Sequence, residues 1–123
     1  MGFDLNGVDP ISIKGEYFRA NVWWWRPLWK FVCNYSDDIL NEEDKERGTW
    51  NDWHEITNKK ANKIADRIYD LDKKGEIKKY EKEYKKEIDN LEDGAFEKNY
   101  PFERDFVIKF ASFCEESGGF NIG

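Results

Sequence analysis

The most unusual stretch of the sequence is the aromatic cluster VWWWRPLWKF at residues 22–31. Three consecutive tryptophans cannot all face one side of a helix, so we expect Trp23 to lie beside Arg19 and Arg26 while its two neighbours face the core. An indole flanked by guanidinium groups can stack on a base or a similar ring while the arginines hold phosphate oxygens. The spacing therefore predicts a nucleotide-like ligand site. The alternative is that Trp24, Trp25 and Trp29 belong to the core and that Trp23 only covers the surface, with arginine packed on it.

A second candidate lies in the segment TWNDWHEIT at residues 49–57, for which we expect a loop. It brings together two indole rings, an amide, a carboxylate and the only histidine of the chain, at Trp50, Asn51, Asp52, Trp53 and His54. Loops of this kind can close over a bound ligand. In the alternative interpretation, the two tryptophans fix a connection to the core and the polar residues form turn hydrogen bonds.

The residue patterns do not support an enzymatic centre. Asp52, His54 and Glu55 lack the second histidine or the cysteine pair of a metal site, so no metal is expected. Neither Cys33 nor His54 has the sequence context of a nucleophile turn. Carboxylates are so abundant in this chain that they do not identify an acid–base pair. The glycine motifs of phosphate loops and dinucleotide sites are missing, so we predict no catalytic residues and no cofactor.

The chain is acidic, with 20 Lys and Arg against 26 Asp and Glu, a formal net charge of -6 and a pI of about 4.9. This charge repels a phosphate backbone, so duplex nucleic acid is not an expected partner. An acidic protein that imitates DNA would fit the sign of the charge. However, residues 74–86 alternate basic and acidic side chains, which is typical of a solvated helix face.

The 123 residues predict a single domain, spanning 1–123. A chain of this size buries about two thirds of the surface that it exposes when unfolded, and an aromatic content of 17% argues against disorder. No apolar run approaches the roughly 20 residues that span a bilayer, and the first residues do not form a secretion signal. We therefore expect a cytoplasmic protein, no membrane partner, and reduced thiols at Cys33 and Cys114.

The elements that must position these residues follow from the apolar spacing. Residues 3–7 and 120–123 alternate apolar and polar side chains and predict two short strands, which we expect to form a small cap. From Glu16 the apolar spacing indicates a helix. Pro27 should kink or restart that helix before it continues to about Tyr35.

Further helices are expected downstream. A short acidic helix should follow a cap at Asn41 and end at Gly48. Thr57 is the expected cap of a longer helix, and the next helix, after Gly75, should fold back on it as an antiparallel hairpin. A richly apolar helix from about Pro101 should form the centre of the core. We predict a mainly α protein: a compact helical domain of about four to five helices, together with a small two-stranded β element from the N- and C-terminal segments.

Parts of the sequence resemble a known group of proteins, namely the blocks MGFDLNGVDP, GEYFRANVWWWRPLWKFVCNY, ADRIYDLDKKGEIKKY and FASFCEESGGFNIG. They are similar to a family of small proteins encoded in bacteriophage, prophage and bacterial genomes. The block GEYFRxNVWWWRPL is the most specific part of this likeness, which covers most of the chain. The resemblance implies a genomic setting and no settled activity. One departure follows Asp52, where related sequences often have a Gly-rich stretch and this chain has Trp53, His54 and Glu55.

This setting favours a protein that acts by binding, because small phage proteins commonly inhibit host enzymes or sequester immune signals. We expect a non-enzymatic counter-defence protein in the bacterial host cytosol. Its partner would be a nucleotide-like small molecule, held at Arg19, Trp23, Arg26 and residues 50–54, or a host defence protein. The alternatives are a small nucleotide-directed hydrolase that uses His54 and nearby carboxylates, and a structural or host-takeover accessory protein. The surplus of aromatic residues is compatible with a homodimer.

Overall fold

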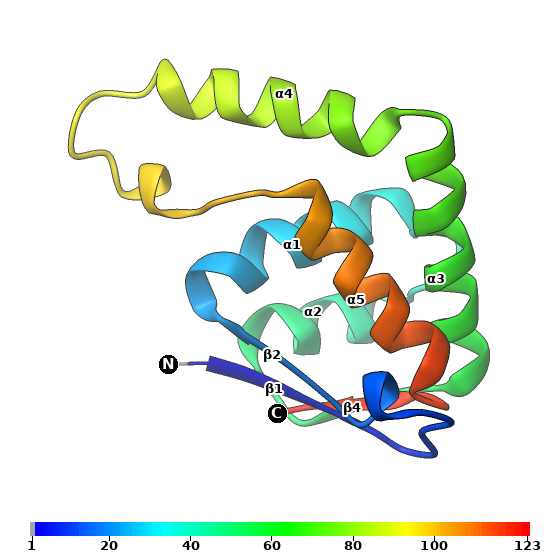
Figure 1. The fold of residues 1–123 in the computed structure, drawn as a ribbon. Helices are drawn as coiled ribbons and strands as arrows, with labels where there is room; N and C mark the ends of the chain where they lie inside the picture. The colour runs from blue at the N-terminus through cyan, green and yellow to red at the C-terminus, as the bar shows by residue number, and fades with distance from the viewer. Residues whose placement is uncertain (1) are drawn as a thin grey trace.

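The computed structural model describes residues 2–123, which form a four-stranded antiparallel sheet with helices packed on one face. The strands are β1 (Gly2–Gly7), β2 (Tyr17–Asn21), β3 (His54–Ile56) and β4 (Phe120–Ile122), and their order in the sheet is β2-β1-β4-β3. Figure 1 shows the sheet along one side of the molecule, with the helices stacked over it. The protein is therefore mainly helical, with the sheet as its base.

The pairing of the two terminal segments confirms the predicted strands, but the sheet is larger than the two-stranded element that we expected. Leu5 of β1 pairs with Phe18 of β2 on one side and with Ile122 of β4 on the other. All three side chains are buried against the helices. The additional strands, β2 and β3, arise in segments for which the sequence predicted the start of a helix and a loop.

Strand β2 corrects the helix that we expected from Glu16. Phe18 and Ala20 are buried and the residues between and beside them are exposed, so burial follows a period of two. In so short a segment, the spacing of Phe18 and Val22 fits a helical period equally well. The helix begins only at Val22, after Asn21, whose side chain accepts a hydrogen bond from a backbone amide of the first turn.

Helix α1 (Val22–Tyr35) passes through Pro27 without the predicted restart. The proline lies early in the helix, so only the backbone hydrogen bond to the Trp23 carbonyl is lost. Trp25 and Trp29 lie on the buried face, with their ring centroids 5.2 Å apart. Trp25 and Trp29 are thus core residues, as both interpretations of the cluster predicted.

Helix α2 (Glu42–Trp50) begins after the predicted cap, Asn41, but continues past Gly48. It ends at Asn51, which adopts the left-handed region with φ 60°. Gly48 has a packing role instead of ending the helix, because a Cβ atom there would overlap the indole of Trp29. The segment predicted as a loop is therefore divided between the last turn of α2 and strand β3.

Helix α3 (Asn58–Lys73) is capped by Thr57, as predicted. Gly75, at φ 78°, allows a sharp turn into α4 (Glu76–Asp89). The expected antiparallel hairpin is wrong, because α4 runs crosswise to α3 over the end of the molecule away from the sheet (Figure 1). The apolar face of α4 packs through Tyr80 and Tyr84 on Phe102.

Helix α5 (Arg104–Glu116) is the buried helix that the apolar pattern predicted. Phe110 and Phe113 contact Phe18 of β2, and both also contact Phe120 of β4. Two short 3-10 turns, η1 (Ile13–Gly15) and η2 (Phe96–Asn99), precede β2 and α5. Within residues 2–123, no helix has the length and apolarity needed to cross a bilayer.

Candidate ligand-binding groove

The structure separates Arg19 from Trp23 and Arg26, the two residues that the aromatic cluster was expected to bring beside it. Arg19 lies on β2 and points to the open face of the sheet, where its Nε is 3.7 Å from a carboxylate oxygen of Asp4. Trp23 lies in the first turn of α1 and packs against Phe96 and Tyr100, at centroid distances of 5.1 and 4.9 Å. Because β2 is a strand, the helical spacing that would join Arg19 to Trp23 does not exist.

Arg26 instead meets a residue from the second candidate segment. Its guanidinium carbon lies 5.4 Å from the centroid of the Trp50 ring, which is a cation–π distance. The ring is 61% exposed and therefore open to a further partner. The two predicted site residues that the structure joins are thus Arg26 of α1 and Trp50 of α2.

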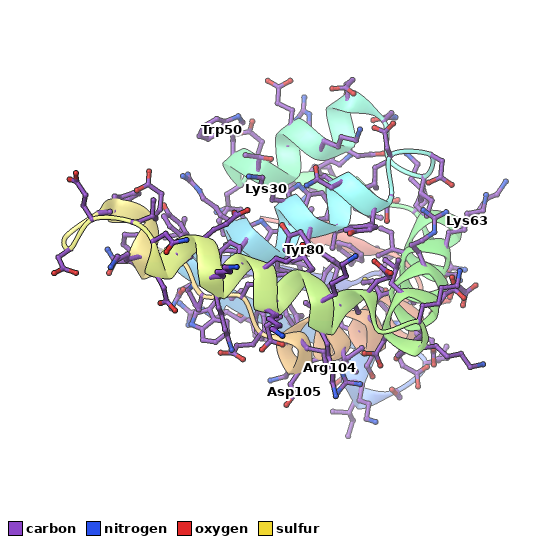
Figure 2. The ribbon with its side chains drawn as sticks, turned by 90° about the horizontal axis from the view of Figure 1, so that it is seen from above. Lys30, Trp50, Lys63, Tyr80, Arg104 and Asp105 are labelled. Carbon is purple, nitrogen blue, oxygen red and sulfur yellow. The ribbon has the colours of Figure 1, made fainter. Side chains whose placement is uncertain are left out.

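Next to this pair, a groove of about 330 Å³ runs between α1 and α2. The buried indoles of Trp25 and Trp29 form its apolar wall, and its other lining residues are polar, cationic or a thiol: Arg26, Lys30, Cys33, Asn34, Lys45 and Thr49. Figure 2 shows Lys30 and Trp50 on these neighbouring helices, on the same side of the molecule. The volume is at the lower end of the range found for small-molecule sites.

The charge of this groove is opposite to that of the whole protein. Its lining contains three cations, Arg26, Lys30 and Lys45, and no carboxylate. Among the residues that the structure describes, Arg26 and Lys30 form no ion pair, while Lys45 is paired with Asp37 and Glu42. The hydrogen bond to Asp37 raises the pKa of Lys45, which therefore stays charged. The groove can therefore attract an anion.

A second groove, of about 360 Å³, lies on the other side of α1 and shares Arg26 and Lys30 with the first. Its lining combines apolar and aromatic residues with two carboxylates: Pro27, Tyr84, Ile88, Leu91 and Tyr100 beside Glu87 and Glu97. Arg26 and Lys30 thus lie between the polar groove and this second, more apolar groove. A ligand with an anionic group and a flat ring, bound at these two cations, would contact both grooves.

The thiol in the polar groove is not a nucleophile at neutral pH. Cys33 is largely enclosed, and burial raises the pKa of its thiol to about 12. The thiolate is the reactive form, and almost none of it is present near pH 7. Cys33 therefore acts as an apolar part of the wall.

The remaining residues of the second candidate segment do not line the groove. Asn51 ends α2, and its Nδ2 donates to the Gly2 carbonyl at 3.4 Å. Asp52 follows in the turn to β3. Trp53 is 65% exposed, and its carbonyl accepts a hydrogen bond from Arg47 at 3.3 Å. The structure thus leaves these three outside the surface that Arg26 and Trp50 share.

His54 belongs to a different, buried cluster. Its Nε2 donates to Oδ1 of Asp44 at 2.6 Å, and Nζ of Lys60 donates to Oδ2 of the same carboxylate at 2.5 Å. Asp44 is 2% exposed and also accepts from the backbone amide of Asn41. Burial by itself would raise the pKa of Asp44, but these hydrogen bonds outweigh it and hold the pKa below its usual value. The cluster ties α2 to β3 and α3, and no metal-binding group is found within residues 2–123.

Sequence reasoning missed Lys30, Asn34, Lys45 and Thr49. A signal for them was present, because Arg26, Lys30 and Asn34 recur every four residues, and so do Lys45 and Thr49. Such spacing places side chains along one stripe of a helix. What the spacing did not reveal was that α1 and α2 pack side by side, which follows from the fit of Gly48 against Trp29.

Comparison of the chain with protein-family models, with curated protein sequences and with solved structures gives no match.

Proposed function

We propose that the protein is a non-enzymatic binding protein that holds a nucleotide-like anion in the groove between α1 and α2. The observation that carries the proposal is the groove itself: three cations and no carboxylate in a chain of net charge -6, beside an exposed indole. Lys45 is balanced by Asp37 and Glu42, but Arg26 and Lys30 form no ion pair among the described residues, and their mutual repulsion costs stability unless an anion balances them.

Each part of a nucleotide has a matching surface there. Arg26 and Lys30 offer unpaired donors for phosphate oxygens, and guanidinium groups bind phosphate in a forked geometry. The amide of Asn34 and the hydroxyl of Thr49 suit the polar edge of a sugar or base. The exposed face of Trp50 offers a stacking surface for a base.

The biological role in this proposal comes from the resemblance to small phage, prophage and bacterial proteins. In that setting, the protein sequesters a nucleotide-derived immune signal in the host cytosol. A host defence protein as the target is the other form of the same counter-defence role. The nucleotide form is favoured by the size and charge of the groove between α1 and α2.

A hydrolase based on His54 stays a prediction with less support. His54 lies outside the residues that line the two grooves beside α1, and its Nε2 is engaged by Asp44. A binding protein releases its ligand chemically unchanged, whereas an enzyme converts it to product. After incubation and denaturation, we expect chromatography to recover the nucleotide intact, whereas a hydrolase would return product.

The binding experiment is a thermal-shift and calorimetric titration with cyclic and linear mono- and dinucleotides. A ligand at 100 times its dissociation constant should stabilise the protein by about 2.7 kcal/mol. Arg26→Ala combined with Lys30→Ala should abolish the shift, whereas Lys82→Ala, which removes a cation from the exposed face of α4, should leave it unchanged. The proposal would be contradicted if the double variant and Lys82→Ala lost the thermal shift equally, or if no nucleotide produced a shift.

A further inference from the structure

A third groove, on the opposite side of the molecule from Trp50, lies between β2 and α5 and has a volume of about 540 Å³. Its apolar surface comes from Phe18, Ile108 and Phe113. Its rim carries the cations Lys14 and Lys109, and at the start of α5 the neighbouring side chains Arg104 and Asp105 (Figure 2). None of these residues belongs to the nucleotide groove, so a function of this surface is independent of that proposal.

Strand β2 is an edge of the sheet, since within residues 2–123 it pairs with β1 alone, in the order β2-β1-β4-β3. The amide of Gly7 donates to the Glu16 carbonyl at 3.0 Å. Because bonded pairs alternate in an antiparallel ladder, Phe18 and Ala20 also direct their backbone groups to β1. The N–H and C=O groups of Tyr17 and Arg19 therefore point away from the sheet, and among the described residues no turn, loop or cap hydrogen bond engages them.

The free edge and the groove together form a template for one more strand. Unpaired backbone groups of an edge strand can bind an extended chain, while pockets beside the edge take alternate side chains. Here those side chains would meet the apolar surface of Phe18, Ile108 and Phe113. The loop before β2 adds exposed apolar side chains, Ile11 and Ile13, which are 75% and 84% exposed.

The charge of the rim indicates the chemistry of the added strand. Among the residues that the structure describes, Lys14 and Lys109 form no ion pair, although the chain has an excess of acidic residues. Arg104 is held by Asp72, with its Nη2 and Nε at 2.6 and 2.8 Å from the two carboxylate oxygens, and by Asp105. The two free lysines therefore suit carboxylates on the incoming chain.

A second copy of this chain fits the edge poorly. Two copies joined along β2 by a two-fold axis would place Lys14 and Lys109 of both copies in one interface, together with Arg19, which lies beside Asp4 of its own chain. Like charges opposite one another across a strand pair are destabilising. The electrostatics thus favour an acidic partner over self-association.

We propose that the groove between β2 and α5 binds an extended, acidic peptide segment of another protein, which adds as a fifth strand beside β2. The backbone groups of Tyr17 and Arg19 pair with the segment. Its central apolar side chains enter the groove over Phe18, and carboxylates near its two ends that face the same side meet Lys14 and Lys109 at the rim. This surface gives the protein a second binding function, for a protein partner.

The first test uses a fluorescently labelled peptide of about seven residues, long enough to span β2, whose groove-facing alternate positions carry Val in the middle and Glu at both ends. Fluorescence anisotropy with the full chain should show saturable binding that weakens with salt. A matched peptide with Lys in place of Glu should not bind. Binding of both peptides with equal affinity, or of neither, would overturn the proposal.

The second test reverses the charge of the rim. Lys14→Glu combined with Lys109→Glu should weaken binding of the acidic peptide by at least about tenfold. Lys82→Glu changes charge on the exposed face of α4, away from the groove, and should have no effect. If Lys82→Glu weakened peptide binding equally, the peptide would be responding to the net charge of the protein, and the proposed binding site would be wrong.

The third test addresses strand addition itself. Arg19→Pro removes the outward N–H without removing a bond to β1, whereas Arg19→Ala removes the same cation and keeps the N–H. The proline variant should lose peptide binding and the alanine variant should retain most of it. Equal binding by both variants would rule out strand addition.

Hydrogen exchange of the unaltered protein keeps the proposal testable even if the proline variant does not fold. The amides of Tyr17 and Arg19 should exchange fast in the free protein and slow down when the peptide is added, while those of Phe18 and Ala20 are slow throughout. Unchanged rates at Tyr17 and Arg19 would overturn the proposal. So would slow exchange at these amides in the free protein together with a dimeric mass, because a second copy would then occupy the edge.

Discussion

Trp25 and Trp29 share their residue type with Trp50 and Trp53, but the two pairs have opposite surroundings. The first two are 0% and 2% exposed, and their indole N–H groups donate to backbone carbonyls of α2, at Gly48 and Lys45, over 2.9 and 3.0 Å. The other two are 61% and 65% exposed. The buried indoles fasten α1 to α2 and thereby form the wall of the polar groove, whereas the exposed indoles are free to contact a partner.

This difference separates stability from binding. A buried aromatic ring contributes through the apolar area removed from water and through its satisfied N–H. An exposed ring contributes little to folding and keeps its face for a ligand. Substitutions at the two kinds of site should therefore act on different measurements.

Trp25→Ala should produce the largest loss of stability. The ring is buried, stacks on Trp29 and Phe3, and donates to the Gly48 carbonyl. Its removal leaves a cavity and an unpaired carbonyl, so we expect a loss of about 3 to 5 kcal/mol in the free energy of unfolding. Urea denaturation followed by circular dichroism would measure it. A loss below about 1 kcal/mol would mean that the ring is not a core residue.

Gly48→Ala tests the contact between α1 and α2 by a change on α2. Alanine is favoured over glycine inside a helix by about 1 kcal/mol, but the added Cβ would overlap the Trp29 indole. We expect the overlap to dominate, with a net loss of about 1 to 3 kcal/mol. Glu46→Ala, on the exposed side of α2, is the matched control and should change the melting temperature little. A more stable Gly48→Ala variant would show that the helices can move apart.

Asp44→Asn should lower the free energy of unfolding by a smaller amount, and that amount should depend on pH. The carboxylate completes the capping box of α2 by accepting from the backbone amide of the cap residue Asn41, and it holds His54 and Lys60, so its loss should cost about 1 to 2 kcal/mol at pH 7, the size of a lost helix cap. Because the pKa of Asp44 is lower in the folded state than in the unfolded state, this contribution is present above the usual pKa of 3.8.

The contribution of Asp44 should then be lost as the pH falls below that value and the carboxylate takes up a proton. Urea unfolding of the parent and of Asp44→Asn at pH 7 and near pH 3 would measure the change. The difference in stability between the two proteins should shrink in acid. A constant difference across this range would contradict the assignment of the shifted pKa to the hydrogen bonds of Asp44.

Trp50→Ala and Trp53→Ala should have the smallest effects on folding, within about 0.5 kcal/mol. They should differ in binding. Neither ring lines the polar groove, but Trp50 contacts Arg26, which does, so its loss should weaken nucleotide binding. The carbonyl of Trp53 is held by Arg47, which does not line the groove, and loss of the Trp53 ring should leave binding unchanged. Titration calorimetry on both variants would compare them. If Trp50→Ala and Trp53→Ala lost affinity equally, the ligand would not be bound at the polar groove.

The secondary structure was predictable where one signal dominated. Asn41 precedes the acidic first turn of a helix and Thr57 precedes helical apolar spacing, and both cap helices as predicted. The segment from Tyr17 to Asn21 was not predictable in the same way, because five residues fit a period of two and a helical period alike, and only pairing with β1 decides between them. The direction of α4 depends on how Tyr80 and Tyr84 pack on Phe102, which lies far away in the sequence.

The candidate site could also be predicted from the sequence only in part. Arg26 and Trp50 were each identified from the sequence, but in different segments and with different expected partners. Their contact depends on the packing of α1 on α2. Trp23 was assigned to the ligand site, and the structure covers one side of its ring with Phe96 and Tyr100. Residue types at a site can thus be recognised locally, while their grouping depends on long-range packing.

The pairing of β1 with β4 also limits how fast the protein can fold. Leu5 and Ile122 are neighbours in the sheet although nearly the whole described chain separates them, and β4 is the only strand that joins β3 to the rest of the sheet among the residues described. Closing so long a loop costs entropy before any ladder hydrogen bond compensates for it. Helices such as α3 can form early, but the sheet can be completed only in a late, concerted step. We expect the protein to fold more slowly than helical bundles of the same size.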